Sequence, residues 1–284
     1  MTTTIFKSGL QAVISHKGAE LISLNNTNSG REYIWEGNRD FWGKHAPVLF
    51  PIVGTLKSGS YTFNGKRYEL PRHGFARERE FELINQSEDG AVFSLKSDAE
   101  TLKIYPFGFE LQIIYELESS RLNISYKIIN SNLISMPFSI GAHPAFALQK
   151  EFENYALEFE KQEDLVCFQL EDDLLSEKTN VLSLKNKRLN LSYHLFENDA
   201  LILKKLESKK ISILENNKAI LNFRFEDFPH FGIWTKKDAP FICLEPWLGY
   251  SDTLQSSGYI EEKEGIQIIE GNTSKTYHYS IEIL

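Results

Sequence analysis

The chain has 284 residues, of which 42% are hydrophobic and 25% charged, a composition typical of a folded globular protein. Its formal net charge is −8 and no run of lysine and arginine forms a basic stripe, so neither nucleic acid nor an anionic membrane surface is an expected partner. No apolar stretch has the length of a membrane span, the N-terminus lacks a signal-peptide pattern and the two cysteines have no metal-ligand spacing, so we expect a cytoplasmic protein.

Apolar and polar residues alternate with a period of two along most of the chain, which predicts half-buried β-strands. The clearest segments are residues 109–113, 122–128 and 277–283. Asn64-Gly65 and Asn216-Asn217 each separate two such segments and predict hairpin turns, the first of type I′.

Helical periodicity is scarce. Residues 198–201 are expected to open one short helical turn, with Asn198 or Asp199 as its cap. No repeat or low-complexity linker divides the chain. We therefore predict an all-β fold, a large antiparallel β-sandwich, formed as a single domain over residues 1–284 with strands from about residue 5 to the C-terminus.

Two histidines lie among small and turn-forming residues. His73 follows Pro71-Arg72 and precedes Gly74, and His143 stands between Ala142 and Pro144. Small neighbours leave room for a ligand beside an imidazole. The alternatives are a turn histidine beside surface arginines for His73 and a core histidine bonded to a backbone carbonyl for His143.

Arginines flank the first histidine at Arg72 and Arg77. Guanidinium groups suit hydroxyl-rich or anionic ligands, and they would lower the affinity of His73 for a proton.

A lone carboxylate, Glu245, follows the apolar run Phe241-Ile242-Cys243-Leu244. A glutamate in such a strand is costly unless it is paired or used, and the alternative to a functional role is a salt bridge to a buried arginine. Trp247 follows closely and is suited to stacking on the C–H face of a sugar. Asp199 is a further candidate, although a cap explains it nearly as well.

Other chemistries find no support in the sequence. Residues 54–59 lack the spacing of a phosphate-binding loop, and no zinc pattern, Gly-x-Ser-x-Gly elbow or second opposed carboxylate is present. We expect no cofactor and no metal.

In their order and spacing, several segments resemble the aldose 1-epimerase (galactose mutarotase) superfamily, most closely its LacX-like branch. They extend over nearly the whole chain and comprise residues 18–21, 33–35, 47–54, 70–77, 141–146 and 244–247.

The resemblance implies a β-supersandwich with an open cleft and no metal or organic cofactor. It implies that Glu245 is the catalytic base, that His143 is the general acid and that His73 and Asp199 bind the substrate. Where the family often carries an arginine after Val53-Gly54, this chain has Thr55-Leu56-Lys57, so Arg77 or Lys57 is the expected basic ligand.

The implied activity is interconversion of the α and β anomers of a hexose by a monomer or homodimer. Glu245, ionised, would take the anomeric proton, while His143, with a pKa near 6.5, would protonate the ring oxygen. Two alternatives remain open: a non-catalytic sugar-binding or sugar-sensing protein on the same fold, and a hexose-phosphate 1-epimerase.

Overall fold

The computed structural model describes residues 1–284. Its larger sheet has nine strands, and each neighbouring pair is antiparallel. In spatial order these strands are β18 (Arg188–Asn190), β15 (Tyr155–Phe159), β20 (Lys210–Glu215), β21 (Lys218–Arg224), β25 (Ser274–Ile283), β11 (Arg121–Asn130), β10 (Phe109–Glu118), β9 (Gly90–Lys96) and β8 (Glu82–Gln86).

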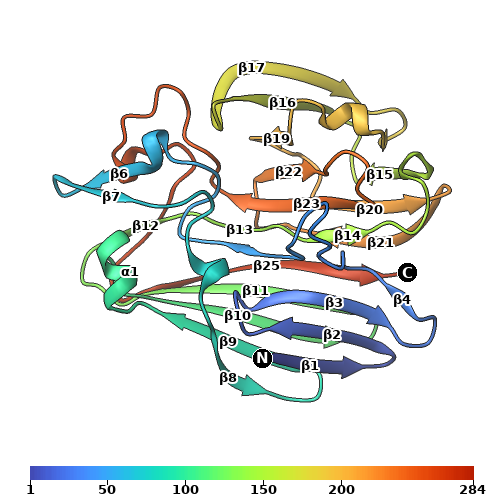
Figure 1. Cartoon of the computed structure of the whole chain (residues 1–284), viewed down its shortest axis with the longest axis horizontal. Coiled ribbons are helices and arrows are strands. Elements are labelled where there is room, and N and C mark those ends of the chain that lie inside the picture. The colour runs from blue at the N-terminus through green and yellow to red at the C-terminus, as the bar shows by residue number, and fades with distance from the viewer.

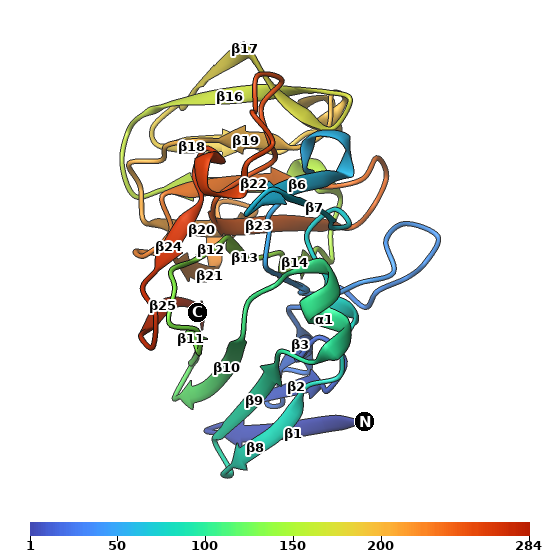
Figure 2. The same cartoon turned by 90° about the vertical axis from the view of Figure 1, so that its left-hand side faces the viewer.

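The second sheet has eight strands and is also antiparallel. In spatial order they are β17 (Leu174–Ser183), β16 (Asp164–Glu171), β19 (Leu201–Leu203), β22 (His230–Trp234), β23 (Phe241–Leu248), β13 (Ile140–Ala142) and β5 (Val48–Leu49), with β14 (Ala145–Ala147) also paired to β23. Figure 1 shows β16, β19, β22 and β23 stacked in one half of the molecule and β8–β11 in the other, and Figure 2 shows the same layers from the side.

Smaller sheets and short helices complete the fold. A four-stranded sheet packs its first strand against β9 and β10; its strands are β1 (Thr2–Lys7), β2 (Leu10–Ser15), β3 (Glu20–Asn26) and β4 (Arg31–Glu32). Two-stranded ladders pair β6 (Ser60–Phe63) with β7 (Lys66–Glu69) and β12 (Met136–Phe138) with β24 (Gln267–Ile269). The helices are α1 (Ala99–Ile104) and the 3₁₀ turns η1 (Lys57–Gly59), η2 (Ala76–Glu78), η3 (Phe152–Asn154), η4 (Tyr193–Phe196) and η5 (Ile260–Glu262).

The antiparallel all-β prediction is confirmed, together with both hairpins. Asn64 and Gly65 have φ angles of 49° and 72°, and Asn216 and Asn217 have φ angles of 49° and 65°. Two consecutive positive φ angles are what a type I′ turn requires, and they match the twist of the flanking strands. The alternation at residues 109–113 marks the beginning of β10, which continues to Glu118.

The short helical turn expected at residues 198–201 is not present. The 3₁₀ turn η4 precedes this segment, and β19 begins at Leu201. Asp199 donates its backbone N–H to the carbonyl of Phe196 and has a φ of 79°, so it ends the turn in a left-handed conformation and does not cap a helix. Aspartate adopts the left-handed conformation more readily than most residues, and it is also a common helix cap. The sequence alone therefore does not separate a residue that caps a helix from one that ends a turn.

The central core lies between the two large sheets. Its 70 buried residues run from Ile5 to Ile283. Phe223 of β21 contacts Phe146 of β14 and Phe231 of β22, so its ring joins one sheet to the other.

Strand β23 is buried along its whole length, and its two faces pack against different groups of residues. Ile242, Leu244 and Leu248 belong to the central core. The alternate residues Cys243 and Trp247 belong to two small apolar clusters outside that core. Because side chains alternate across a strand, Glu245 shares this second face, which is the floor of the site described below.

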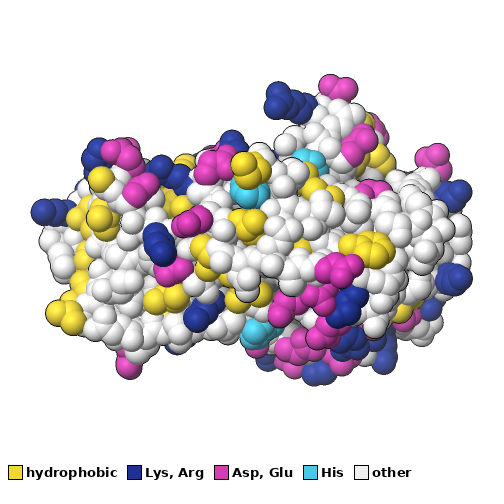
Figure 3. Space-filling model, turned by 90° about the horizontal axis from the view of Figure 1, so that it is seen from below, with side chains coloured by type: hydrophobic (Ala, Val, Ile, Leu, Met, Phe, Trp, Pro, Cys, Tyr) yellow, Lys and Arg dark blue, Asp and Glu magenta, His cyan; other side chains and the backbone are white.

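The surface carries charges of both signs. On the face seen in Figure 3, lysine and arginine side chains are interspersed with aspartate and glutamate. No helix in the structure combines the length and apolar character that a membrane span requires.

Candidate active site

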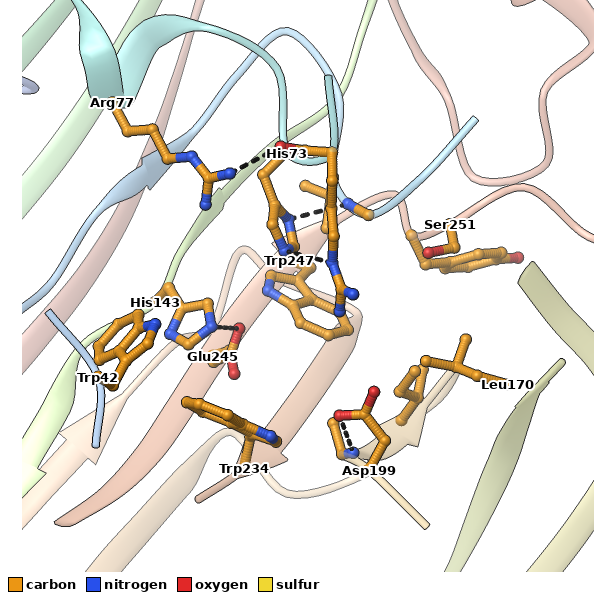
Figure 4. A pocket seen from close by; sticks show the side chains of 16 residues that line it. Trp42, His73, Arg77, His143, Leu170, Asp199, Trp234, Glu245, Trp247 and Ser251 are labelled. Atoms are coloured by element: carbon orange, nitrogen blue, oxygen red, sulfur yellow. Dashed lines mark hydrogen bonds and ion pairs between the residues drawn. The ribbon is translucent and has the colours of Figure 1, made fainter. Parts of the chain in front are cut away.

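A cavity of about 320 Å³ opens on the face of the eight-stranded sheet that points away from the central core. Six of the seven residues predicted from the sequence line it: His73, Arg77, His143, Asp199, Glu245 and Trp247. Figure 4 shows these side chains arranged around one space, although they come from segments far apart in the chain.

Lys57 is the predicted residue that the structure does not bring to this cavity. Its Nζ donates to the backbone carbonyls of Leu254 and Ser256, at 2.7 and 3.3 Å. The ammonium group is therefore used to hold a neighbouring loop, and we do not assign it to the site. Sequence reasoning could not detect this because the carbonyls lie about two hundred residues away in the chain.

Strand pairing brings His143 and Glu245 together. Strands β13 and β14 both pair with β23, and His143-Pro144 forms the break between them. The break lies beside Glu245, so Nε2 of His143 is 3.2 Å from Oε2 of Glu245. The glutamate side chain is only 2% exposed. The two groups can therefore exchange a proton directly.

Burial determines the protonation of this pair. It raises the pKa of the Glu245 carboxyl well above its usual range, an effect that the nearby Arg72 guanidinium partly opposes. Burial also lowers the pKa of His143 to about 3, with smaller contributions from Arg77 and Arg72. A low-dielectric site disfavours both charged forms. These directions differ from the expectation of a histidine near its reference pKa and an ionised glutamate, and they favour the neutral pair.

Aromatic side chains enclose the pair. Trp42 stacks on the His143 ring with centroids 4.8 Å apart, and Trp234 meets it edge-on at 5.8 Å. Trp247 fits against two glycines, since a Cβ at Gly232 would lie 2.5 Å from its ring and one at Gly141 would lie 2.6 Å from it. Trp42 and Trp234 were not among the residues predicted from the sequence, and their aromatic side chains, Trp42 directly after Phe41, were the available signal. Arg72, noted there as a guanidinium flanking His73, also lines the cavity.

His73 lies next to the His143–Glu245 pair, with its ring edge-on to that of His143 and the two ring centroids 6.1 Å apart. Its φ of 66° is left-handed, and its ring Nδ1 accepts a hydrogen bond from the backbone N–H of Gly54 at 3.0 Å. Burial lowers its pKa well below the usual value, followed by the neighbouring His143, Arg77 and Arg72. The sequence-based expectation that the two arginines oppose protonation therefore agrees in direction with this shift.

Polar groups around the cavity remain available to a ligand. Asp199 uses one carboxylate oxygen to accept the N–H of Ala200 at 2.8 Å. Arg77 donates to the carbonyl oxygen of Arg72 at 2.9 Å and forms no ion pair. Three of the eight buried side-chain atoms without a hydrogen-bond partner belong to cavity residues, namely Arg77 Nε, His143 Nδ1 and Trp247 Nε1. This concentration of unpaired polar groups favours a polar ligand.

One cluster has the residue types of a metal site. His143, Cys243 and Glu245 offer ligand atoms that lie within 4.8 Å of one another. A metal needs the thiolate form of cysteine, whereas burial raises the pKa of the Cys243 thiol well above its usual value. The donor set therefore fits a proton-transfer pair beside a neutral thiol better than it fits a metal.

Comparison with known proteins gives consistent results along the chain. A family model described as aldose 1-epimerase matches residues 1–262. The chain is 33% identical to Protein LacX (plasmid) of Lactococcus lactis subsp. lactis over the full length of both. The structure of a galactose mutarotase related enzyme from Lactobacillus acidophilus matches 100% of this chain and 97% of its own length, at 33% identity and a TM-score of 0.95. A galactose mutarotase-like protein from Lactobacillus casei ATCC 334 aligns over both full lengths at 30% identity and a TM-score of 0.91.

Proposed function

Because the chain belongs to the aldose 1-epimerase family, we propose that it interconverts the α and β anomers of a free hexose by acid–base ring opening and closure. The observation that carries the proposal is the 3.2 Å contact between His143 and Glu245 at the floor of a polar, tryptophan-lined cavity. Ring opening needs a general base and a general acid, and a buried pair that shares one proton can provide both.

Ring opening begins from the ion-pair form, which differs from the neutral pair by one proton transfer between His143 and Glu245. The Glu245 carboxylate takes the proton of the anomeric hydroxyl, and the C1–O1 bond becomes a carbonyl. The C1–O5 bond breaks, its electrons go to the ring oxygen, and His143 protonates that oxygen. The products are the open aldehyde and the neutral His143–Glu245 pair, which burial favours.

Closure reverses these steps after the C1 end has rotated. The C5 hydroxyl attacks the other face of the carbonyl and returns its proton to His143, while Glu245 protonates the new anomeric oxygen. No covalent enzyme intermediate is formed. In this scheme Trp247 and the other indoles pack against the C–H face of the ring, and His73, Asp199 and Arg77 bind its hydroxyls.

The test is polarimetry of freshly dissolved α-glucose and α-galactose, corrected for the spontaneous reaction. Glu245→Gln keeps the volume and an acceptor but cannot take a proton, so we expect a rate loss of about 10²- to 10⁴-fold with an unchanged thermal melt. His143→Asn should slow ring opening comparably, whereas His73→Asn should also weaken binding. Glu282→Gln, at a glutamate outside the cavity, is the matched control. Wild-type rates in folded Glu245→Gln would remove the proposed base.

A hexose phosphate is the second candidate substrate, and Arg77 is the observation that favours it. Its guanidinium lines the cavity without a carboxylate partner, as a site for an anionic substituent would require. Anomerisation of glucose 6-phosphate, and not of glucose, would favour this candidate. Sugar binding without anomerisation of either substrate would instead identify a sugar-binding protein.

A further inference from the structure

The ring of His73 is fixed by the backbone of Gly54. The two residues are joined twice, since His73 donates its backbone N–H to the Gly54 carbonyl at 2.8 Å and Gly54 donates its own N–H to Nδ1 at 3.0 Å. A neutral imidazole that accepts at Nδ1 must carry its proton on Nε2. His73 then has its N–H donor at Nε2, while the ring as a whole lines the cavity.

Arg72 competes with this arrangement. Its Nε lies 3.3 Å from Nε2 of His73, and a guanidinium can only donate. If the Gly54 amide moved away, the proton would move to Nδ1 and Nε2 would accept from Arg72. The tautomer of His73 therefore depends on how firmly Gly54 is held.

A second segment holds Gly54 in place through its neighbours. The N–H of Thr55 donates to Ser251 Oγ at 3.0 Å, and the N–H of Asp252 donates to the Thr55 carbonyl at 2.8 Å. The N–H of Lys57 donates to Oδ2 of Asp252 at 2.8 Å. The two segments approach so closely that a Cβ on Gly54 would lie 2.6 Å from the Ser251 nitrogen.

The far side of Asp252 is bound by a buried lysine. Nζ of Lys263 donates to Oδ1 of Asp252 at 2.8 Å and to the Tyr250 carbonyl at 2.6 Å. The two side chains are 2% and 4% exposed. Burying two charges costs desolvation energy that their attraction often only balances, so a gain in stability does not by itself explain why this pair is present. Neither residue lines the cavity.

We propose that the Asp252–Lys263 pair positions His73: it clamps the segment at residues 250–252 to the segment at residues 54–57, and so keeps the Gly54 N–H on Nδ1 and the His73 proton on Nε2. Both residues are positioning residues that act through Gly54. The group that accepts the hydrogen bond from Nε2–H is a hydroxyl of the sugar, so this step rests on the proposed function, whereas the tautomer itself is a property of the protein without sugar.

The test replaces the charged pair by neutral residues of similar size, Asp252→Asn with Lys263→Met. Removing both charges together avoids leaving one of them buried and unpaired. The ring nitrogens of His73 are followed by ¹⁵N NMR of selectively labelled protein, assigned by the signals lost in His73→Asn. We expect the Nε2–H tautomer in the wild type and a mixture with Nδ1–H in the double variant. KM for the sugar should rise about 3- to 10-fold, the effect of one hydrogen bond, while kcat changes less.

A control removes a partly buried ion pair elsewhere in the chain, Arg31–Glu215, by Arg31→Met with Glu215→Gln. This control should leave the tautomer of His73 and KM unchanged even if the protein melts earlier. If the double variant does not fold, Ser251→Ala removes the acceptor of the Thr55 N–H; because Ser251 also lines the cavity, this variant is read out by the tautomer of His73 and not by KM.

A folded double variant with the wild-type tautomer and KM would overturn the proposal, as would an Nδ1–H tautomer in the wild type. If the wild type does not anomerise sugars but its Nε2–H tautomer still shifts in the double variant, the proposed function is overturned and the positioning role stays in place.

Discussion

At the residue scale, the chemistry depends on two side chains whose protonation is set by their surroundings. Glu245 and His143 are ordinary in sequence, but each is buried, and burial shifts their pKa values in opposite directions. Since they are in contact, the pair titrates as a unit that holds one proton between the two shifted values. That one-proton state includes both the ion-pair form and the neutral form.

This shared proton predicts the pH dependence of the reaction. As pH falls, the second proton enters only near the lowered pKa of His143, about 3, so kcat/KM should not decline as pH falls through 6.5. As pH rises through the raised pKa of Glu245, the pair loses its proton and activity should decline. Polarimetric rates from pH 4 to 9 check this, with circular dichroism to show that the protein stays folded. A halving of kcat/KM as pH falls through 6.5 would contradict it.

At the element scale, strand β23 separates the central core on one of its faces from the cavity on the other. Ile242, Leu244 and Leu248 belong to the core between the sheets, whereas Glu245 and Trp247, on the other face of the strand, line the cavity. The flanking strands accommodate Trp247 because β13 and β22 carry glycine opposite its ring, at Gly141 and Gly232. Glycine is needed at both places for space, since neither position has a positive φ.

The packing of Trp247 on Gly232 predicts the effect of Gly232→Ala. A Cβ 2.5 Å from the indole must displace the ring into the cavity, because the glycine side of the contact is backbone. We expect a raised KM for the sugar and a loss of about 1–3 kcal/mol in unfolding free energy from overpacking. Gly108→Ala is the control, since its Cβ would lie 3.4 Å from the nearest atom, the side chain of Asn132. Equal kinetics in the two variants would argue against a binding role for Trp247.

At the scale of the whole molecule, the site depends on the packing of the two large sheets. All four tryptophans, Trp35, Trp42, Trp234 and Trp247, lie in the small clusters on the cavity side of the eight-stranded sheet. Intrinsic fluorescence therefore reports on that side, whereas circular dichroism reports on strands throughout the chain.

Phe223→Ala tests the coupling between the sheets. The ring is fully buried and contacts aromatic residues of β14 and β22, so its loss should lower the free energy of unfolding by about 3–5 kcal/mol. If the chain is one domain, as the sequence predicts, fluorescence and circular dichroism should give the same midpoint in urea. Two separate transitions, with only one of them shifted by the substitution, would contradict the single-domain prediction.

The local features of this protein could be predicted from its amino-acid sequence. Alternation marked the strands because side chains of a half-buried strand face core and solvent in turn, and Asn64-Gly65 marked a turn because those residues tolerate positive φ. The small residues around His73 and His143, and the apolar run before Glu245, singled out three side chains that line one cavity. Each of these signals lies within a few neighbouring residues.

Only the tertiary structure decided which distant groups meet. It put His143 against Glu245 by pairing two short strands with β23, stacked Trp42 on the histidine and took Lys57 out of the cavity to bind carbonyls of another loop. Burial in the folded chain also shifts the pKa values of the His143–Glu245 pair away from the expected ones, toward the neutral forms. The reason is physical: a contact between residues a hundred positions apart, and the dielectric environment that sets a pKa, are sums over many segments that no local pattern contains.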